Sequence, residues 1–406
     1  MKRILFGQLV TMAEEPDAPP LENGELLIDG ENIVAINSQP SESFSGETID
    51  LSDSLILPGF VNAHCHLSLS GLKGKIPQGL KFVNWIRQVV KLNTALPFTE
   101  RAREMQIAAQ EMLASGVTTL VDYFSHPELL PEYAQLPFRQ VLLYEVLGFQ
   151  KSKAEENVRR VESLLKEHTG HDGKIQLGLA PHAPYSVAPE LYEKLIELAE
   201  KYQCLWSCHV AEVAEEQEFL ETGKGPFRDL LEERGVWEET WNPPGVSPVK
   251  YLDEMDVLEN MQAVHLNKMD EQDIHLLKRN NASAVFCPGS TRWFGRARYI
   301  PVRELLDAGI PVGLGTDSYA SNDGLNFLRE IRLAGAMLPD VSRAEILWMA
   351  TVGGALASGI SGGELVMGAR ADLIVFRLKN KSRIWWDTIF DQIGEGPDRV
   401  FMAGSA

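Results

Sequence analysis

The sequence is poor in cysteine, in positive charge and in long apolar runs. Four cysteines in 406 residues do not form the disulfide framework that stabilises small secreted proteins. The 38 Lys and Arg residues are outnumbered by 57 Asp and Glu, and the net charge of -19 argues against nonspecific binding to nucleic acid or anionic membranes. No apolar run approaches the roughly 20 residues that cross a bilayer, and the opening MKRILFGQLV lacks a convincing cleavage site. We therefore expect a cytoplasmic globular protein.

Short β-rich runs alternate with longer helical patterns through the middle of the chain. Such alternation is the sequence sign of repeated parallel βα units. The segments TERAREMQIAAQEMLASG and APELYEKLIELAEKY carry apolar residues at three- and four-residue spacing, as the outer helices of a barrel do. Eight β-rich runs close a (β/α)8 barrel, and eight are found here: LILPGFVNA, VTTLVDY, RQVLLYEV, KIQLGLAP, QCLWSCHV, MQAVHL, ASAVFC and IPVGLGT.

The two ends of the chain differ from its middle. GELLIDGENIVAINSQP near the start and GELVMGARADLIVFRL near the end are short strands broken by glycine turns. We expect these half-sheets to combine into one small β-sandwich. The predicted architecture is therefore α/β, with a TIM-type (β/α)8 barrel at residues 58–359 and a composite β-sandwich from residues 1–57 and 360–406.

The stretch PGFVNAHCHLSLSG sets His64 and His66 one residue apart at the end of an apolar run. On a strand, residues i and i+2 point to the same face, so the two imidazoles project together while Cys65 faces away. Alone, such a pair is usually two partly exposed histidines. A metal site needs three or four donors from separate elements, so the rest of the chain must supply the others.

Further donors stand at the ends of other predicted strands. His182 follows the fourth run in APHAPYS, and His209 ends the fifth in CHVAE. His265 ends the sixth in VHLN, and Asp317 follows the eighth in GTDSYASN. Each residue alone has a structural explanation, since a histidine can bond a backbone carbonyl and an aspartate can cap a helix. Together, at the strand ends where barrel enzymes build their active sites, they indicate a metal centre.

These motifs resemble those of the amidohydrolase superfamily. PGFVNAHCH, HVAE, HLN and GTDS are similar in particular to its mononuclear aminohydrolase branch, which includes S-adenosylhomocysteine, aminodeoxyfutalosine and guanine deaminases and chlorotriazine hydrolases. The resemblance implies the metal ligands His64, His66, His209 and Asp317. The binuclear branch has a carboxylated lysine where this chain has His182, so one divalent ion is implied. Zinc suits this ligand set, and ferrous iron fits it also.

The resemblance also implies catalytic roles. A water on the metal loses a proton more readily; Asp317 is expected to accept that proton, and His265 to orient the hydroxide. Glu212, in the HxxE motif, is expected to protonate the ring nitrogen and then the leaving ammonia. A solvated acid is the alternative for Glu212, because three further glutamates follow closely in the same run. His182 and Trp85 are expected to contact the substrate, with support of the metal site and core packing as their respective alternatives.

Three arginines follow the seventh predicted strand in CPGSTRWFGRARY: Arg292, Arg296 and Arg298. On a chain of net charge -19, this run of guanidinium groups fits the capture of a substrate carboxylate. Pairing with surface acids is the alternative. S-adenosylhomocysteine and aminodeoxyfutalosine both carry a carboxylate remote from the aminopurine.

The function expected from the sequence is a metal-dependent hydrolytic deaminase of an amino-substituted N-heterocycle, of adenine-nucleoside type with a distal carboxylate. Alternatives with the same fold are a hydrolase that removes chloride or an amine from a triazine ring, and a guanine or pterin deaminase. A metal-free scaffold is the alternative from another class, and the complete ligand set argues against it. We expect a small-molecule substrate and no nucleic-acid or membrane partner; a homodimer is left open.

Overall fold

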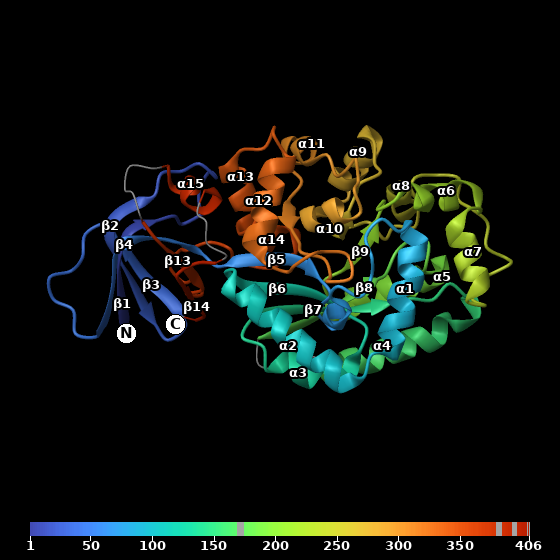
Figure 1. Ribbon diagram of the computed structural model, residues 1–406, viewed down its shortest axis with the longest axis horizontal. Helices are drawn as coiled ribbons and strands as arrows, with labels where there is room; N and C mark the ends of the chain where they lie inside the picture. The colour runs from blue at the N-terminus through green and yellow to red at the C-terminus, as the bar shows by residue number, and fades with distance from the viewer. Residues whose placement is uncertain (169–173, 379–383, 392–395, 404, 406) are drawn as a thin grey trace.

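The computed structural model of the chain describes residues 1–168, 174–378, 384–391, 396–403 and 405. Figure 1 shows two bodies: a β-rich one that contains both chain ends, and a larger one in which helices surround strands. In the described ranges, no helix has both the length and the apolar character that crossing a membrane requires.

Parallel strands form the centre of the larger body. In the part of the chain that the structure describes, they make two four-stranded sheets, in the orders β5-β6-β7-β8 and β12-β11-β10-β9. The strands are β5 (Phe60–Cys65), β6 (Val117–Phe124), β7 (Arg139–Val146), β8 (Ile175–Pro181), β9 (Ser207–Val210), β10 (Gln262–His265), β11 (Ser283–Phe286) and β12 (Val312–Leu314). Each falls within or beside one of the eight runs expected from the sequence.

Backbone contacts join the two sheets at both edges. Leu179 in β8 bridges Trp206, just before β9, and Cys65 in β5 bridges Asp317, just after β12. The backbone N–H of Asp317 donates to the carbonyl oxygen of His64 at 3.1 Å. The strands thus close into the (β/α)8 barrel expected from the sequence, in which the first and last strands are neighbours.

Helices cover the outside of the barrel (Figure 1). The helices are α1 (Phe82–Ala95), α2 (Phe98–Ala114), α3 (Leu130–Ala134), α4 (Ala154–His168), α5 (Pro189–Tyr202), α6 (Ala214–Thr222), α7 (Pro226–Glu233), α8 (Pro248–Glu254), α9 (Glu271–Arg279), α10 (Pro288–Trp293), α11 (Val302–Asp307), α12 (Phe327–Met337), α13 (Arg343–Met349), α14 (Val352–Ala357) and α15 (Trp385–Phe390), with 3-10 turns η1 (Leu67–Leu72), η2 (Pro127–Leu129) and η3 (Lys151–Lys153). In α5 the buried Leu191, Leu195 and Leu198 recur at three- and four-residue spacing on one face, which is why this segment packs as a helix. Gly116, just past α2, adopts a left-handed φ of +99°, which glycine does without steric cost.

The smaller body is a mixed sheet that combines strands from both ends of the chain. Among the described residues it has six strands in the order β14-β13-β4-β1-β2-β3. They are β1 (Lys2–Leu9), β2 (Leu21–Asp29), β3 (Asn32–Asn37), β4 (Glu47–Pro58), β13 (Leu373–Arg377) and β14 (Arg399–Phe401). Its core includes Ile4, Phe6 and Leu26. The expected composite β unit is confirmed, and its boundaries at residues 57 and 360 stay a prediction.

One strand boundary differs from the prediction. The sequence assigned residues 55–58 to the first barrel strand, but they end β4, where they pair with β1 and β13. The apolar run is continuous from Leu55 to Ala63 except for Pro58, Gly59 and Asn62. Periodicity therefore does not show where the chain passes from one sheet to the next.

Side chains fill the inside of the barrel below its functional end. Val61, Val121 and Val264 belong to one buried cluster that also contains Tyr123. The Tyr123 ring packs edge-on against His64, with ring centroids 4.5 Å apart. This packed interior supports the His64 ring from below and fixes its position.

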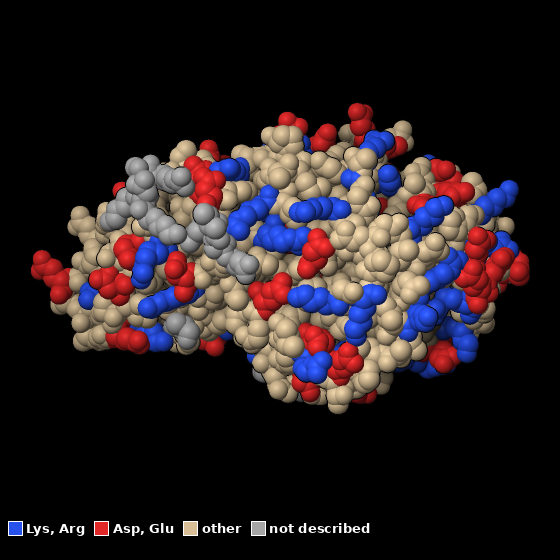
Figure 2. Space-filling view, in the orientation of Figure 1, with Lys and Arg blue, Asp and Glu red and all other residues tan. Residues whose placement is uncertain are grey.

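The surface carries charges of both signs. Acidic and basic side chains are interspersed over the face shown in Figure 2. Arg87 of α1 and Glu233 of α7 form an exposed ion pair at 2.8 Å, which contributes little stability by itself. The pair nevertheless links two helices whose inner faces line the cavity described below.

Asn62 forms hydrogen bonds across the seam where the barrel closes, between its first strand, β5, and its last strand, β12. It is fully buried; its Nδ2 donates to Thr316 Oγ1 at 2.9 Å, and its Oδ1 accepts from the Thr316 backbone N–H at 3.1 Å. Asn62 lies two residues before His64, and Thr316 immediately precedes Asp317. These paired hydrogen bonds therefore fix the relative position of two functional strand ends that are distant in sequence.

Replacing Asn62 by alanine should destabilise the barrel. The substitution leaves the backbone N–H of Thr316 without an acceptor in the interior and removes the donor to its hydroxyl oxygen, which costs roughly 1–3 kcal/mol. The midpoint of thermal unfolding, followed by circular dichroism, should fall by several degrees. Asn242→Ala, at an exposed position, is the matched control and should unfold like the wild type. An unchanged midpoint for Asn62→Ala would show that the seam does not depend on this side chain.

Candidate metal centre

His64 and His66 lie at the end of β5, with their ring centroids 4.9 Å apart. Cys65 points away from them, as the strand alternation predicts, and its thiol donates a hydrogen bond to Asp122 Oδ1 at 2.9 Å. The same carboxylate oxygen accepts from the Leu67 backbone N–H at 2.6 Å. Asp122, a buried residue that the sequence did not single out, therefore holds the chain just after the two histidines.

Two more side chains complete a convergent group. The Nε2 atoms of His66 and His209 are 3.3 Å apart. Asp317 Oδ1 lies 3.9 Å from His64 Nε2 and 3.8 Å from His66 Nε2, and its Oδ2 accepts from the Ser321 hydroxyl at 2.8 Å. Donors about 2.0–2.2 Å from one zinc ion in a tetrahedron lie roughly 3.3–3.6 Å from one another. The observed separations are close to that range.

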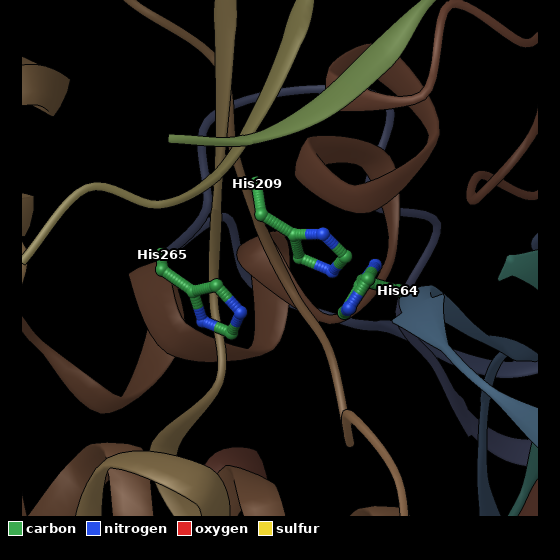
Figure 3. A group of neighbouring side chains, drawn as sticks. All are labelled: His64, His209 and His265. Atoms are coloured by element: carbon green, nitrogen blue, oxygen red, sulfur yellow. The ribbon is translucent and has the colours of Figure 1, made fainter. Parts of the chain in front are cut away.

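His209 has one ring nitrogen available for a metal. Its Nδ1 lies 2.9 Å from the carbonyl oxygen of His182, to which it must donate because a carbonyl can only accept. The lone pair of Nε2 is then free. Figure 3 shows the rings of His64, His209 and His265 gathered at one place inside the barrel. A hydrogen bond from the second nitrogen is the usual way in which a protein orients a histidine ligand.

Burial keeps these histidines neutral. Desolvation, followed by the neighbouring histidines, lowers the pKa of His64 and His66 well below the usual value, and desolvation lowers the pKa of His209. Neutral imidazole is the form that binds a metal. Neither ring nitrogen of His64 has a hydrogen-bond partner among the described residues, although buried polar atoms are nearly always satisfied. The residues present therefore fit a divalent metal ion.

Glu212 and His265 lie beside this group. Glu212 Oε1 is 2.6 Å from Arg296 Nη2 and 3.7 Å from His265 Nε2. The backbone N–H groups of Ala211 and Glu212 donate to the Glu216 carboxylate at 3.1 and 2.9 Å, which fixes the turn after β9. Burial raises the pKa of Glu212, and the Arg296 guanidinium partly opposes that rise. A carboxyl group with a raised pKa is suited to proton transfer near neutral pH.

The backbone is in a rare conformation at the same strand ends. Positive φ angles occur at Ala211 (+53°), His265 (+79°), Leu266 (+50°) and Asp317 (+57°). Such conformations cost non-glycine residues about 1–3 kcal/mol each and persist where the surrounding structure imposes them. Two of these residues are His265 and Asp317 themselves. The other two are their neighbours in the site, since Ala211 precedes Glu212 and Leu266 follows His265.

A cavity of about 390 Å³ opens from this group, and His66, His209 and Asp317 form part of its wall. Trp85 and His182, which the sequence assigned to the substrate, also line it. The Trp85 indole is held in place because Nε1 donates to the Ala320 carbonyl at 2.7 Å. Much of the remaining wall is apolar and includes Phe82, Ile86, Val89, Phe149, Phe227 and Leu230. A cavity of this size and composition suits a small organic molecule.

Two charged residues in the cavity wall, Glu145 and Arg234, were not expected from the sequence. Glu145 lies near the end of β7, and burial raises its pKa to about 8. A signal was present, since it is the one acid in the apolar run RQVLLYEV and stands at a strand end where barrel side chains reach the active site. Arg234 directly follows α7 in a charged stretch, LEERG, which gives no such signal.

The arginines expected at the substrate are placed differently. Arg292 and Arg298 are exposed and are not among the described residues that line the cavity. The short helix α10 buries Trp293 and thereby turns Arg292 outward. Arg296 is buried, with its side chain 8% exposed, and pairs with Glu212. Of the three, the structure thus brings only Arg296 to the site, where its observed partner is a carboxylate of the chain itself.

Comparison with known proteins decides the family. The model of the amidohydrolase family matches residues 55–405. The chain belongs to the amidohydrolase family. It is 32% identical over 393 residues to a 5-methylthioadenosine/S-adenosylhomocysteine deaminase from Pelotomaculum thermopropionicum, an alignment that covers 92% of this chain and 84% of that protein.

Solved structures agree with the assignment. Aminofutalosine deaminase from Helicobacter pylori, in complex with methylthio-coformycin, has a TM-score of 0.85 and 25% identity, with 100% of this chain and 99% of that chain covered. An adenosine deaminase from Xanthomonas campestris with bound zinc has a TM-score of 0.84 and 26% identity, with 100% and 92% covered. The expected superfamily, barrel fold and hydrolytic enzyme class are therefore confirmed for this amidohydrolase.

Removing the guanidinium of Arg296 should raise the pKa of Glu212. Arg296→Met leaves the Glu212 carboxylate buried without its partner, so the charged form becomes less stable. Whether turnover requires Glu212 protonated or ionised, the limb of the pH–rate profile that reports this group should move to higher pH. Arg298→Met removes an exposed charge from the same loop and should leave the profile unchanged. Identical profiles for wild type and Arg296→Met would exclude the coupling.

Proposed function

We propose that this amidohydrolase is a metal-dependent hydrolytic deaminase of an adenine-nucleoside-type compound. The observation that carries the proposal is the convergence of neutral His64, His66 and His209 with Asp317, at a cavity whose wall includes His66, His209 and Asp317. Glu212, a buried carboxyl group with a raised pKa, lines the same cavity. The names of the relatives, a 5-methylthioadenosine/S-adenosylhomocysteine deaminase and an aminofutalosine deaminase, support this class of reaction.

We assign one divalent ion to His64, His66, His209 and Asp317. Such an ion supplies Lewis acidity, which lowers the pKa of a coordinated water toward neutrality. β8 is the fourth strand of the barrel, and His182 follows it. This chain therefore has a histidine where the binuclear branch has the lysine that bridges two metals. A set of three nitrogens and one oxygen suits zinc or ferrous iron, and the zinc of the Xanthomonas adenosine deaminase favours zinc.

Two side chains transfer protons, and a third orients the attacking oxygen. Asp317 accepts a proton from the attacking water. His265, whose Nε2 lies 3.7 Å from Glu212 Oε1, hydrogen-bonds to the attacking oxygen and orients it. Glu212 protonates the ring nitrogen next to the reacting carbon, so that negative charge does not build up there. Arg296 holds the Glu212 carboxylate through the hydrogen bond at 2.6 Å.

The reaction exchanges one bond to carbon for another. The oxygen of water forms a C–O bond at the ring carbon that carries the amino group, and the C–N bond to that group breaks. One of the two protons of the water, taken up by Asp317, goes to the departing amino group, which leaves as ammonia. The other leaves the new hydroxyl group as it becomes a carbonyl and replaces the proton that Glu212 gave to the ring nitrogen. One water is consumed and one ammonia is released, and the ring carbon becomes a carbonyl.

One stretch of the cavity wall supports a substrate with an apolar extension that ends in an anion. Leu230, Leu231 and Val236 line the cavity together with Arg234, which is close to them in sequence. A guanidinium can capture a carboxylate by paired hydrogen bonds. We therefore assign the distal carboxylate of an aminodeoxyfutalosine-type or S-adenosylhomocysteine-type substrate to Arg234, in place of Arg292 and Arg298.

A substrate panel tests the proposed function. Ammonia release should be measured with aminodeoxyfutalosine, S-adenosylhomocysteine, methylthioadenosine, adenosine, guanine and a pterin, and chloride release with a chlorotriazine. The account predicts ammonia from the adenine nucleosides, with the highest kcat/KM for those that carry a distal carboxylate. Chloride release from the triazine without ammonia from any nucleoside would overturn the proposal.

Glu212→Gln should separate proton transfer from metal binding. Glutamine keeps a similar shape but cannot exchange the proton, so kcat should fall by about 10²-fold or more, while the metal content stays that of the wild type. Glu218→Gln makes the same change at an exposed position in the following helix and serves as the matched control. Normal turnover by Glu212→Gln would remove this residue from the mechanism.

A further inference from the structure

Glu145 is an acid in the cavity wall to which the reaction above gives no role. Its side chain is 11% exposed and its Oε1 lies 3.9 Å from His182 Nε2. In the part of the chain that the structure describes, no group donates a hydrogen bond to its carboxyl oxygens. A carboxyl group that is this well buried usually has a donor, so a donor from outside the chain is the natural partner.

Ser186 holds the His182 ring in place. The Ser186 hydroxyl oxygen lies 2.7 Å from His182 Nδ1 and 3.0 Å from the Ala183 carbonyl oxygen, so Nδ1 is engaged within the chain. His182 Nε2 faces Glu145 Oε1 at 3.9 Å, which is beyond hydrogen-bond distance.

Two polar groups thus face each other across a short gap in the cavity. A pair of hydroxyl groups satisfies both, because each hydroxyl can donate as well as accept. A second metal ion would require further ligands, and the group includes His209, whose donor atom lies within 4.8 Å of those of Glu145 and His182. His209 Nδ1 is already donating to the His182 carbonyl, and its Nε2 lies 3.3 Å from His66 Nε2. A group with two O–H donors therefore fits the gap better than a cation.

We propose that Glu145, together with His182, binds the vicinal hydroxyl groups of the substrate's sugar. The inference rests on the proposed function and adds the part of the nucleoside that these residues recognise. The ring centroids of His182 and His209 are 5.1 Å apart, so the pair adjoins the metal group, as the sugar of a nucleoside adjoins its base. Glu145 hydrogen-bonds to one or both hydroxyls, and His182 Nε2 hydrogen-bonds to the other.

The test compares each nucleoside with its 2′,3′-dideoxy analogue. For the wild type, removing the hydroxyls from adenosine or from the best substrate of the panel should lower kcat/KM by about 10- to 100-fold, the range for the loss of two hydrogen bonds. Glu145→Gln should lower kcat/KM for the ribonucleoside by a similar factor, mainly through KM. The same variant should process the dideoxy analogue at the wild-type rate, which also shows that it is folded.

Controls separate the outcomes. Glu259→Gln, at an exposed position, should retain the wild-type preference for the ribonucleoside, and metal content should be equal in all three proteins. If Glu145→Gln keeps the full wild-type preference, the sugar assignment is wrong while the proposed function stands. Loss of one of two bound metal ions in Glu145→Gln would replace the sugar site by a metal site. A wild type that deaminates no nucleoside would overturn both the proposed function and this inference.

Discussion

Closure of the barrel between its first and last strands is the constraint on which the site depends. The hydrogen bonds between Asn62 and Thr316 join two segments that are 254 residues apart in sequence, and so bring His64 and Asp317 together. The proposed ligands come from three strand ends, and only the closed barrel places them at one point. Because the unfolded chain lacks this arrangement, metal binding and folding are expected to be thermodynamically coupled.

Burial at these strand ends shifts the pKa values of acids and bases in opposite directions. It lowers the pKa of His64, His66 and His182, which keeps imidazoles ready as ligands and acceptors, and it raises the pKa of Glu145 and Glu212. One low-dielectric environment therefore produces both neutral nitrogen donors and carboxyl groups whose pKa lies above the usual value. Of these two acids, only Glu212 has the Arg296 guanidinium beside it, and this charge partly opposes the rise of its pKa.

The sequence was sufficient for the strands and for the central histidines but not for the residues around them. Strand alternation shows which faces His64 and Cys65 occupy, and both lie as expected, because a period of two is a local property. The pairing of Arg296 with Glu212 joins loops 84 residues apart, and no local pattern encodes it. Glu145 has a recognisable position in its strand, but its relation to His182 depends on how β7 and β8 pair in space.

The number and environment of bound metal ions test the central claim most directly. Purified protein reconstituted with zinc can be examined by elemental analysis and X-ray absorption spectroscopy. The account predicts close to one ion per chain, with nitrogen and oxygen ligands at about 2.0–2.2 Å. Two ions per chain would require ligands beyond the four proposed, and a sulfur ligand at about 2.3 Å would require a cysteine such as Cys65 to face the site. Either result would contradict the account.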